Sequence, residues 1–382
     1  MSDLPSPSAE ALAHSEKLAT LIRGEIAANG GWLPFARYME LALYAPGLGY
    51  YTAGARKLGR EGDFITAPEM TPLFGQTLAR QAAQVLESGL DQILEIGAGS
   101  GALAAALLKE LEQLDRLPRQ YYILEVSPDL RERERDLLAQ QVPQLLERVI
   151  WLNRLPTLYR GLIIGNEVLD AMPVHMVRIG AAGVEEGGVG VNGETFSWAW
   201  RPAAEPLRAA AAALHLPEGY QTEIQLVARA FVSTLAQALE RGVILLIDYG
   251  FPAHEYYHAQ RSEGTLMCHY RHRAHADPFF LPGLQDITSH VDFSAVARAG
   301  AEAGLELLGY TGQAQFLINC GITDILLRTP PENAAAYLPQ ASAAQQLLSP
   351  SEMGELFKVI ALGKDYAAPL IGFASGDRSA AL

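Results

Sequence analysis

The chain has 382 residues, of which 49% are hydrophobic and 19% charged, and this composition excludes an intrinsically disordered protein. Its length corresponds to roughly two to three domains. The formal net charge of −14 disfavours a nucleic-acid partner, because an acidic surface repels phosphate backbones. No segment approaches the ~20 apolar residues of a transmembrane helix, so we expect no membrane span.

Cysteine usage and the first residues narrow the class of protein further. The cysteines, Cys268 and Cys320, are too few for a disulfide framework. Histidines follow Cys268, but no second cysteine pair completes a zinc pattern, so we expect no metal site. Residues 1–10 lack the Arg-rich or apolar start of a transit or signal peptide. We therefore expect a bacterial cytoplasmic protein, and the sequence leaves its oligomeric state open.

The first 70 residues predict a helical extension followed by a long loop. After a loose tail, a helix is expected from Ser8 to Ala28, and a second, amphipathic helix from Phe35 to Tyr44. The stretch 47–70 is rich in glycine, tyrosine and polar residues. Loops of this length between helices are more often functional than idle, so we expect a functional role for it.

The most informative stretch is Gln-Ile-Leu-Glu-Ile-Gly-Ala-Gly-Ser-Gly at residues 92–101. A helix capped by Thr71 precedes it, an apolar strand opens it, and a helix over residues 102–114 follows. Strand, glycine turn and helix bring bare backbone against a nucleotide-like ligand in α/β sheets. The same residues satisfy the Gly-x-Gly-x-x-Ala dinucleotide fingerprint, so the motif alone does not distinguish methyl transfer from hydride transfer.

Two acidic residues favour S-adenosylmethionine over a dinucleotide. Glu95 lies two residues before Gly97, where a carboxylate would oppose dinucleotide phosphates but suits a ligand with an ammonium group and no phosphate. Glu125, at the end of the next expected strand (121–126), can accept hydrogen bonds from ribose hydroxyls. The alternatives are a satisfied buried acid for Glu95 and a helix N-terminal acid for Glu125.

Further strands alternate with helices, which predicts an α/β fold with a parallel sheet and helices on both faces. Two segments, 174–226 and 252–293, interrupt this alternation. The later strands are expected at 149–152, 162–165, 243–249, 304–310 and 356–362. The domain plan is an extension and loop (1–70), core (71–173), an inserted segment (174–226), core (227–251), a second inserted segment (252–293), the end of the core (294–365) and a tail (366–382).

An acidic loop follows the expected strand 162–165. Asn166, Glu167 and Asp170 are separated by apolar residues, and ligands of open α/β sheets bind beyond the carboxyl ends of the strands. Two carboxylates and an amide suit a cationic acceptor, since a guanidinium bonds a carboxylate bidentately. Methyl transfer is an in-line displacement, so positioning of the acceptor supplies most of the catalysis. The alternative is a helix cap with surface acids.

Six motifs occur in a fixed order along the chain, and together they carry a resemblance to a known family. They are Gly-Asp-Phe-Ile-Thr-Ala-Pro-Glu at 62–69, Glu-Ile-Gly-Ala-Gly-Ser-Gly at 95–101, Asn-Glu-Val-Leu-Asp-Ala-Met-Pro-Val at 166–174, Asp-Tyr-Gly at 248–250, Asp-Ile-Thr-Ser-His-Val-Asp-Phe at 286–293 and Met-Gly-Glu-Leu-Phe-Lys-Val at 353–359. With these motifs, nearly the whole chain resembles the MidA family of class I S-adenosylmethionine-dependent methyltransferases.

The resemblance implies a fold, a cofactor and an activity. The fold is a Rossmann-like class I methyltransferase with a seven-stranded, mostly parallel sheet, a helical N-terminal extension and inserted lid segments. The cofactor is S-adenosyl-L-methionine. The activity is protein arginine N-methylation, with a symmetric dimethylarginine in a respiratory complex I subunit as the product of the mitochondrial members, which are complex I assembly factors. Val168 and Leu169 stand where the family has aromatic residues.

Carried over by position, the resemblance also assigns roles to individual residues. The catalytic candidates are Asn166, Glu167, Asp170 and His290, with a purely structural histidine as the alternative for His290. The substrate side is formed by Asp248, Tyr249 and Asp292. The loop 63–69 would cover the cofactor or substrate, with a structural turn as its alternative. The cofactor-binding candidates are Asp63, Thr66, Pro68, Glu69, Glu95, Gly97, Gly99, Gly101, Glu125 and Asn166.

Three other functions stay open at this point. A methyltransferase for an uncharged small molecule would not need the carboxylates of Glu167 and Asp170. A non-catalytic assembly protein would keep its role after losing donor binding. A nicotinamide dehydrogenase would bind NAD saturably.

Overall fold

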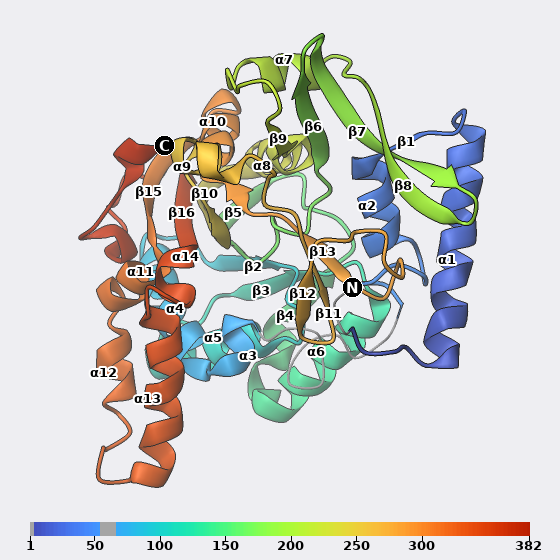
Figure 1. The fold of residues 1–382 in the computed structure, drawn as a ribbon. Coiled ribbons are helices and arrows are strands. Elements are labelled where there is room, and N and C mark those ends of the chain that lie inside the picture. The colour runs from blue at the N-terminus through green and yellow to red at the C-terminus, as the bar shows by residue number, and fades with distance from the viewer. Residues whose placement is uncertain (1–3, 54–65) are drawn as a thin grey trace. The chain divides into compact units, whose positions relative to one another are not determined.

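The computed structural model describes residues 4–53 and 66–382, and the chain divides into two compact units (Figure 1). The first unit comprises Met1–Phe64, Leu169–Ala230 and Phe251–Asp292. The second comprises Ile65–Val168, Phe231–Gly250 and Phe293–Leu382. No helix within the described residues has the length and apolar character needed to cross a membrane.

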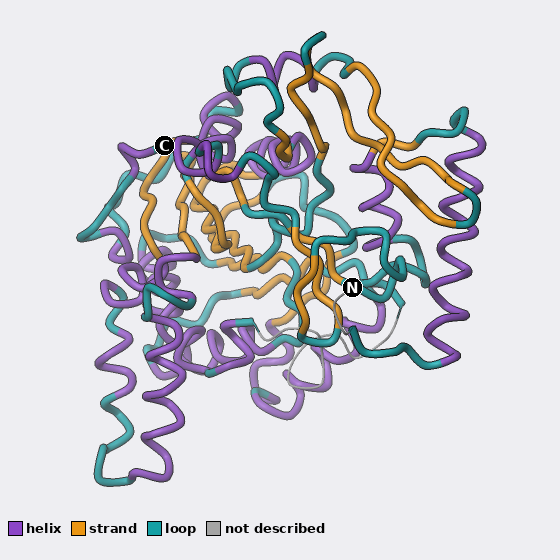
Figure 2. The backbone as a smooth tube through the Cα atoms, viewed as in Figure 1, coloured by secondary structure: helices purple, strands orange, loops and turns teal. Residues whose placement is uncertain are grey.

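The second unit is built on a sheet with the strand order β15-β16-β10-β5-β2-β3-β4, whose strands are orange in Figure 2. Neighbours from β10 to β4 pair in parallel, whereas β16 is antiparallel to both β10 and β15. This arrangement confirms the expected mostly parallel sheet with an antiparallel last strand. The strands are β2 (Gln92–Ile96), β3 (Gln120–Leu124), β4 (Val149–Leu152), β5 (Tyr159–Asn166), β10 (Leu239–Phe251), β15 (Glu306–Gly312) and β16 (Phe357–Lys364).

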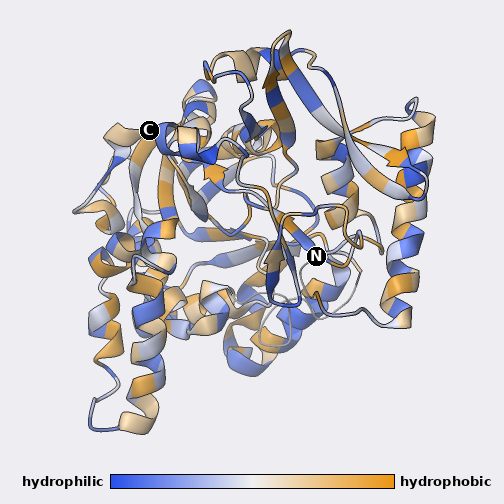
Figure 3. Ribbon diagram, in the orientation of Figure 1, coloured by the Kyte–Doolittle hydropathy of each residue, from blue (hydrophilic) through white to orange (hydrophobic). Residues whose placement is uncertain are grey.

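The helices of the second unit follow the expected signals in its first half. Thr71 accepts the N–H of Leu73 and caps α4, and Ser127 accepts the N–H of Leu130 and caps α6, whose hydrophilic residues are blue in Figure 3. The helices are α3 (Ala67–Met70), α4 (Pro72–Glu87), α5 (Ala102–Gln113), α6 (Pro128–Gln141), η1 (Pro143–Arg148), α10 (Phe293–Glu302), α11 (Gln313–Asn319), α12 (Ile322–Leu326), α13 (Ala334–Leu348), α14 (Met353–Leu356), η3 (Ile371–Phe373) and η4 (Ser379–Ala381). Helix α8 (Leu226–Ala238) spans the boundary of the two units.

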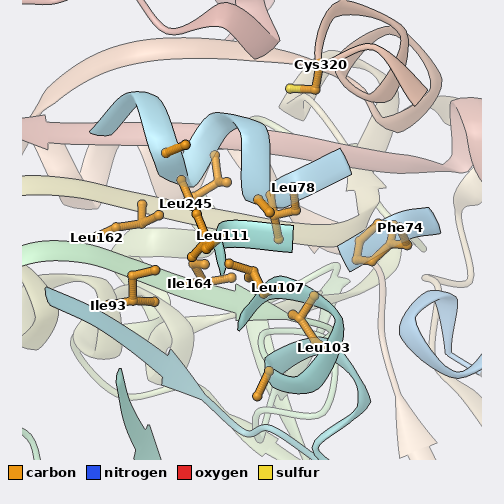
Figure 4. Close-up of a cluster of buried hydrophobic side chains, with 14 of the residues drawn as sticks. Phe74, Leu78, Ile93, Leu103, Leu107, Leu111, Leu162, Ile164, Leu245 and Cys320 are labelled. Atoms are coloured by element: carbon orange, nitrogen blue, oxygen red, sulfur yellow. The ribbon is translucent and has the colours of Figure 1, made fainter. Parts of the chain in front are cut away.

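The apolar core of the second unit lies between α4, α5 and the sheet. Leu103, Leu107 and Leu111 recur every fourth residue and form one face of α5. Together with Ile93 and Ile164 they belong to one cluster of buried side chains (Figure 4). Because both faces of β2 and β5 are covered, these strands read as continuous apolar runs, which is why they are evident in the sequence.

The last residues of the chain are packed against the second unit. Phe373 is buried, and its ring lies where a Cβ at Gly309 of β15 would be, at 2.3 Å. The Thr311 hydroxyl donates to the carbonyl of Gly376 at 2.8 Å, and the N–H of Arg378 donates to the carbonyl of Tyr310 at 2.6 Å. Residues 366–382 therefore complete the β15 edge of the sheet.

The first unit contains two small sheets and the predicted N-terminal helices. Ser8 caps α1 (Ala9–Ala28), and α2 (Phe35–Tyr44) has the expected bounds. The inserted segments, together with β1 from the N-terminal part, form the sheets β1-β7-β6-β9, with β8 on β7, and β12-β11-β13. The remaining elements are β1 (Leu33–Pro34), β6 (His175–Gly180), β7 (Gly183–Asn192), β8 (Thr195–Pro202), α7 (Leu207–Ala212), β9 (Gln221–Ile224), α9 (Ala253–Tyr256), η2 (Ala259–Arg261), β11 (Met267–Tyr270), β12 (Arg273–His275), β13 (Asp286–Thr288) and β14 (Val291–Asp292).

The close contact of α4 with α5 gives a prediction on stability. A Cβ at Gly75 of α4 would lie 2.6 Å from the Cβ of Ala106 in α5, so Gly75→Ala should force the helices apart. We expect a loss of about 1–3 kcal/mol, seen as a melting temperature lower by about 3–8 °C.

The matched control is Gly24→Ala in α1, where a Cβ would meet no atom within 4 Å. There the substitution should leave the melting temperature unchanged or raise it, because alanine stabilises a helix interior by about 0.5–1 kcal/mol relative to glycine. Equal effects of the two substitutions would contradict the packing.

Candidate functional site

The glycine turn connects β2 to α5 in the second unit. The backbone of Gly97, Gly99 and Gly101 has φ values of 65°, 60° and 84°, which is the left-handed region that favours glycine. The N–H of Gly97 donates to the carbonyl of Leu124 at 3.0 Å and fixes the turn on β3. A Cβ at Gly97 would meet only the Val168 side chain, at 3.6 Å. The turn therefore leaves bare backbone at the start of α5, where a ligand can approach the helix N-terminus.

Glu95 lies on β2 just before this turn and is 2% exposed. One carboxylate oxygen accepts the hydroxyl of Tyr121 at 2.6 Å. Burial raises the pKa of Glu95 to about 7, with a contribution from the Glu125 charge, while the Tyr121 hydrogen bond acts in the opposite direction. Burial therefore disfavours the ionised form of Glu95 despite its hydrogen bond with Tyr121.

Glu125 is the first residue after β3, which ends at Leu124. The strand is thus two residues shorter at this end than the predicted strand 121–126. Its Oε1 accepts the N–H of Ser127 at 2.7 Å, so one oxygen holds the turn into α6. Burial is the largest influence and raises the pKa of Glu125, whereas the backbone hydrogen bonds and the charge of Arg131 lower it. The carboxylate therefore has a structural partner and also lies at the carboxyl end of the sheet.

Sequence reasoning missed a third acid, Glu134 of α6. It is fully buried, accepts the indole N–H of Trp151 at 2.7 Å, and its Cα would lie 3.3 Å from a Cβ at Gly101. Burial, with a smaller contribution from the charges of Glu125 and Glu95, raises the pKa of Glu134 to about 8, against the effects of the Trp151 hydrogen bond and the Arg131 charge. In the sequence this residue stands within an alternating run of charges, and no periodic signal marks it as buried.

The loop after β5 is held by β10. The N–H of Glu167 donates to the carbonyl of Ile247 at 2.8 Å, and the N–H of Val168 donates to Asp248 Oδ2 at 3.1 Å. Asp248 Oδ1 accepts the N–H of Tyr249 at 2.9 Å, and Asp248 is only 1% exposed. Both Asp248 oxygens thus bind backbone, which positions the loop. Glu167 adopts the left-handed φ of 52°, a conformation that costs a non-glycine residue free energy and that this clamp maintains.

Asn166 ends β5, and its amide carries two different features. Its Nδ2 donates to Glu167 Oε1 at 3.2 Å, while its buried Oδ1 has no hydrogen-bond partner within the part of the chain that the structure describes. A buried amide oxygen of this kind is suited to accept a hydrogen bond from a ligand. Because β5 pairs with β2 in parallel, Asn166 lies at the same edge of the sheet as the glycine turn.

The expected cover loop is described only in part. Thr66, Pro68 and Glu69 lie at or in the one-turn helix α3, which packs against α4 and α5. Asp63 lies outside the described residues. Residues 66–69 of the predicted cover loop 63–69 are thus described, and they belong to the second unit.

Three further predicted residues belong to the first unit. The carbonyl of Asp170 accepts the N–H of Ser289 at 3.0 Å, Asp292 Oδ2 accepts the hydroxyl of Tyr257 at 3.0 Å, and the His290 ring stacks on Phe251 at 5.2 Å. Sequence reasoning missed Gln225, whose amide donates to the carbonyl of His290 at 2.7 Å and accepts the N–H of Asp292 at 2.9 Å. This polar residue between β9 and α8 holds the His290–Asp292 segment in place.

The second unit thus gathers most of the predicted cofactor site at the carboxyl ends of β2, β3, β5 and β10. Ligands of open α/β sheets bind at this edge. Buried carboxyls, an orphaned amide oxygen and bare backbone fit a cationic nucleoside ligand better than a pyrophosphate. Among the described residues, no three or more His, Cys, Asp and Glu side chains are arranged to hold a metal ion. The gathered residues are Glu95, Gly97, Gly99, Gly101, Glu125, Asn166, Glu167, Asp248 and Tyr249.

Fold and site together define a class I S-adenosylmethionine-dependent methyltransferase, and three comparisons agree. The model of the family "Putative S-adenosyl-L-methionine-dependent methyltransferase" matches residues 77–311. A Burkholderia thailandensis crystal structure of a candidate methyl transferase, bound to S-adenosyl-homocysteine, is 53% identical with a TM-score of 0.97 and full coverage of both chains. The mouse mitochondrial protein arginine methyltransferase NDUFAF7 is 31% identical over 87% of this chain and 81% of its own.

The chain therefore belongs to this methyltransferase family, the MidA-like family that the motifs indicated. The Drosophila melanogaster homologue of NDUFAF7 is 27% identical over 97% of this chain and 91% of its own length. The cofactor of the chain is S-adenosyl-L-methionine, as expected from the glycine turn and Glu95.

The raised pKa of Glu95 gives a prediction on donor binding. Below the pKa of about 7 this carboxyl is neutral, and above it the carboxylate attracts the sulfonium cation. Affinity for S-adenosylmethionine relative to S-adenosylhomocysteine, which lacks the sulfonium charge, should therefore rise about tenfold from about pH 6 to about pH 8. Titration calorimetry with both ligands across this range measures the ratio.

The ratio should become flat in Glu95→Gln, which cannot ionise. The control Glu87→Gln, at an exposed residue paired with Arg116, should keep the wild-type slope. A wild-type ratio that does not change with pH would contradict the assignment of Glu95 to the donor site.

Proposed function

We propose that the protein is a protein arginine N-methyltransferase. The observation that carries the proposal is the clamped loop after β5, which presents an amide and a carboxylate, Asn166 and Glu167, beside the glycine turn. A carboxylate recognises the planar guanidinium bidentately, and the name of the mouse relative states arginine as its substrate. A symmetric dimethylarginine, in a respiratory complex I subunit, is the first candidate for the product.

In this proposal each residue of the second unit has a distinct role toward donor or acceptor. Bound S-adenosylmethionine supplies an electrophilic methyl group on a sulfonium sulfur. The backbone of Gly97 and Gly99 binds the donor closely, Glu125 accepts hydrogen bonds from its ribose, and Glu95 balances its positive charge. Asn166 orients the donor through its Oδ1. Thr66, Pro68 and Glu69 cover the site.

Glu167 holds the acceptor guanidinium and keeps its charge away from the nitrogen that attacks the methyl carbon. Asp248 fixes the loop that carries Glu167, and Tyr249 borders the acceptor. The roles that the motifs imply for Asp170, His290 and Asp292, acceptor binding and proton removal after transfer, stay predictions. The inserted segments 174–226 and 252–293 serve the protein substrate in this scheme.

The test is incubation of the purified protein with isotope-labelled S-adenosylmethionine and a bacterial lysate, followed by mass-spectrometric mapping of the label. We expect label on arginine side chains. We also expect Glu167→Gln to lower the rate of labelling by about a hundredfold, because the charged hydrogen bonds to the guanidinium are lost, while affinity for S-adenosylhomocysteine changes less than about threefold.

The matched control is Asp129→Asn in α6, a partly exposed acid that pairs with Arg133 and should leave the labelling rate unchanged. Label confined to small molecules would overturn the proposal in favour of a small-molecule methyltransferase. Donor binding without any label would overturn it in favour of a non-catalytic assembly protein.

A further inference from the structure

Arg131 of α6 bridges two strand ends at the edge of the sheet that carries the donor site. Its Nε donates to the carbonyl of Glu125 at 2.6 Å, directly after β3. Its second guanidinium nitrogen, Nη2, donates to the carbonyl of Leu152, the last residue of β4. One planar cation therefore binds the backbone of both strands at the end of their ladder, whose last pair is Leu124 and Leu152.

This bridge fixes the backbone from which the Glu125 side chain projects. Where the β3–β4 ladder ends, the carbonyls of both strands need other donors, and the guanidinium supplies them in a rigid geometry. The Glu125 carboxylate is fixed from the other side by the N–H of Ser127, whose carbonyl accepts the N–H of Arg131 at 3.1 Å. Glu125 is thus held at its backbone by Arg131 and at its carboxylate by the first residues of the same helix.

The charge of Arg131 favours the ionised form of the Glu125 carboxyl that the hydrogen bonds hold in place. The positive charge of Arg131 lowers the pKa of Glu125 and of Glu134, against the effect of burial, which raises both. Arg131 is partly buried, and its side chain bonds to the carbonyls of Glu125 and Leu152, not to the glycine turn or to the loop after β5. Any effect of Arg131 on donor binding is therefore exerted through Glu125.

We propose that Arg131 is a positioning residue for the ribose end of the donor, which keeps the Glu125 carboxylate oriented toward the ribose hydroxyls. The inference rests on the proposed role of Glu125 in donor binding. Loss of the bridge frees the Glu125 peptide, so the carboxylate no longer meets both hydroxyls. The adenine and methionine ends of the donor keep their own contacts.

The experiment compares binding of S-adenosylhomocysteine and of its 2′-deoxyribose analogue to the full chain by calorimetry. Arg131→Met should lower the affinity for S-adenosylhomocysteine by at least about tenfold and the affinity for the analogue by less than about threefold, because only the former offers both ribose hydroxyls. The affinity of Arg131→Lys, which keeps the charge and one donor group, should lie between those of the wild type and Arg131→Met. In a Glu125→Gln background, Arg131→Met should weaken binding by less than about threefold.

Arg148→Met is the matched control, since Arg148 also donates to a backbone carbonyl, that of Pro118, at 2.9 Å near the opposite ends of β3 and β4. It should leave both affinities unchanged. Equal weakening of both ligands by Arg131→Met, or no weakening of either, would overturn the inference. If the wild type itself shows no preference for S-adenosylhomocysteine over the analogue, the proposed role of Glu125 fails first.

Discussion

The burial of carboxyl groups beside the glycine turn is the constraint on which the donor site depends. Glu95 is enclosed because β2 is covered on both faces, and Glu134 approaches the turn because Gly101 has no side chain. Burying an ionised carboxylate without a cation is costly, so these groups have raised pKa values. A cation bound beside these carboxyls would offset that cost, which is the physical basis of the role proposed for Glu95.

The position of the loop after β5 depends on a second constraint, its hydrogen bonds to the neighbouring strand β10. Asp248 uses both oxygens for the backbone of Val168 and Tyr249, and the carbonyl of Ile247 binds the N–H of Glu167. These bonds keep Glu167 in a left-handed conformation that it would not adopt in a free chain. Asp248 therefore holds the polar loop after β5 in place.

The sequence predicted the elements whose signals are local. Buried parallel strands are continuous apolar runs, so the sheet of the second unit was predictable. Thr71 and Ser127 cap α4 and α6, so the starts of these helices were predictable as well. The helices between residues 313 and 356 were not predicted, because α11, α12 and α14 are short and Pro339 interrupts the pattern of α13. Glu134 bonds to Trp151 of β4, Asp248 to the backbone of Val168, and Arg131 to the carbonyl of Leu152, and no periodicity encodes such contacts.

We expect a buried carboxyl beside the glycine turn, that of Glu95, to lose its proton when the cationic donor binds. Difference infrared spectroscopy at neutral pH measures this directly through the band of the protonated carboxyl group. S-adenosylmethionine should diminish the band, S-adenosylhomocysteine should diminish it less, and Glu95→Gln should remove the difference. Identical spectra for the two ligands in the wild type would show that Glu95 does not respond to the sulfonium charge.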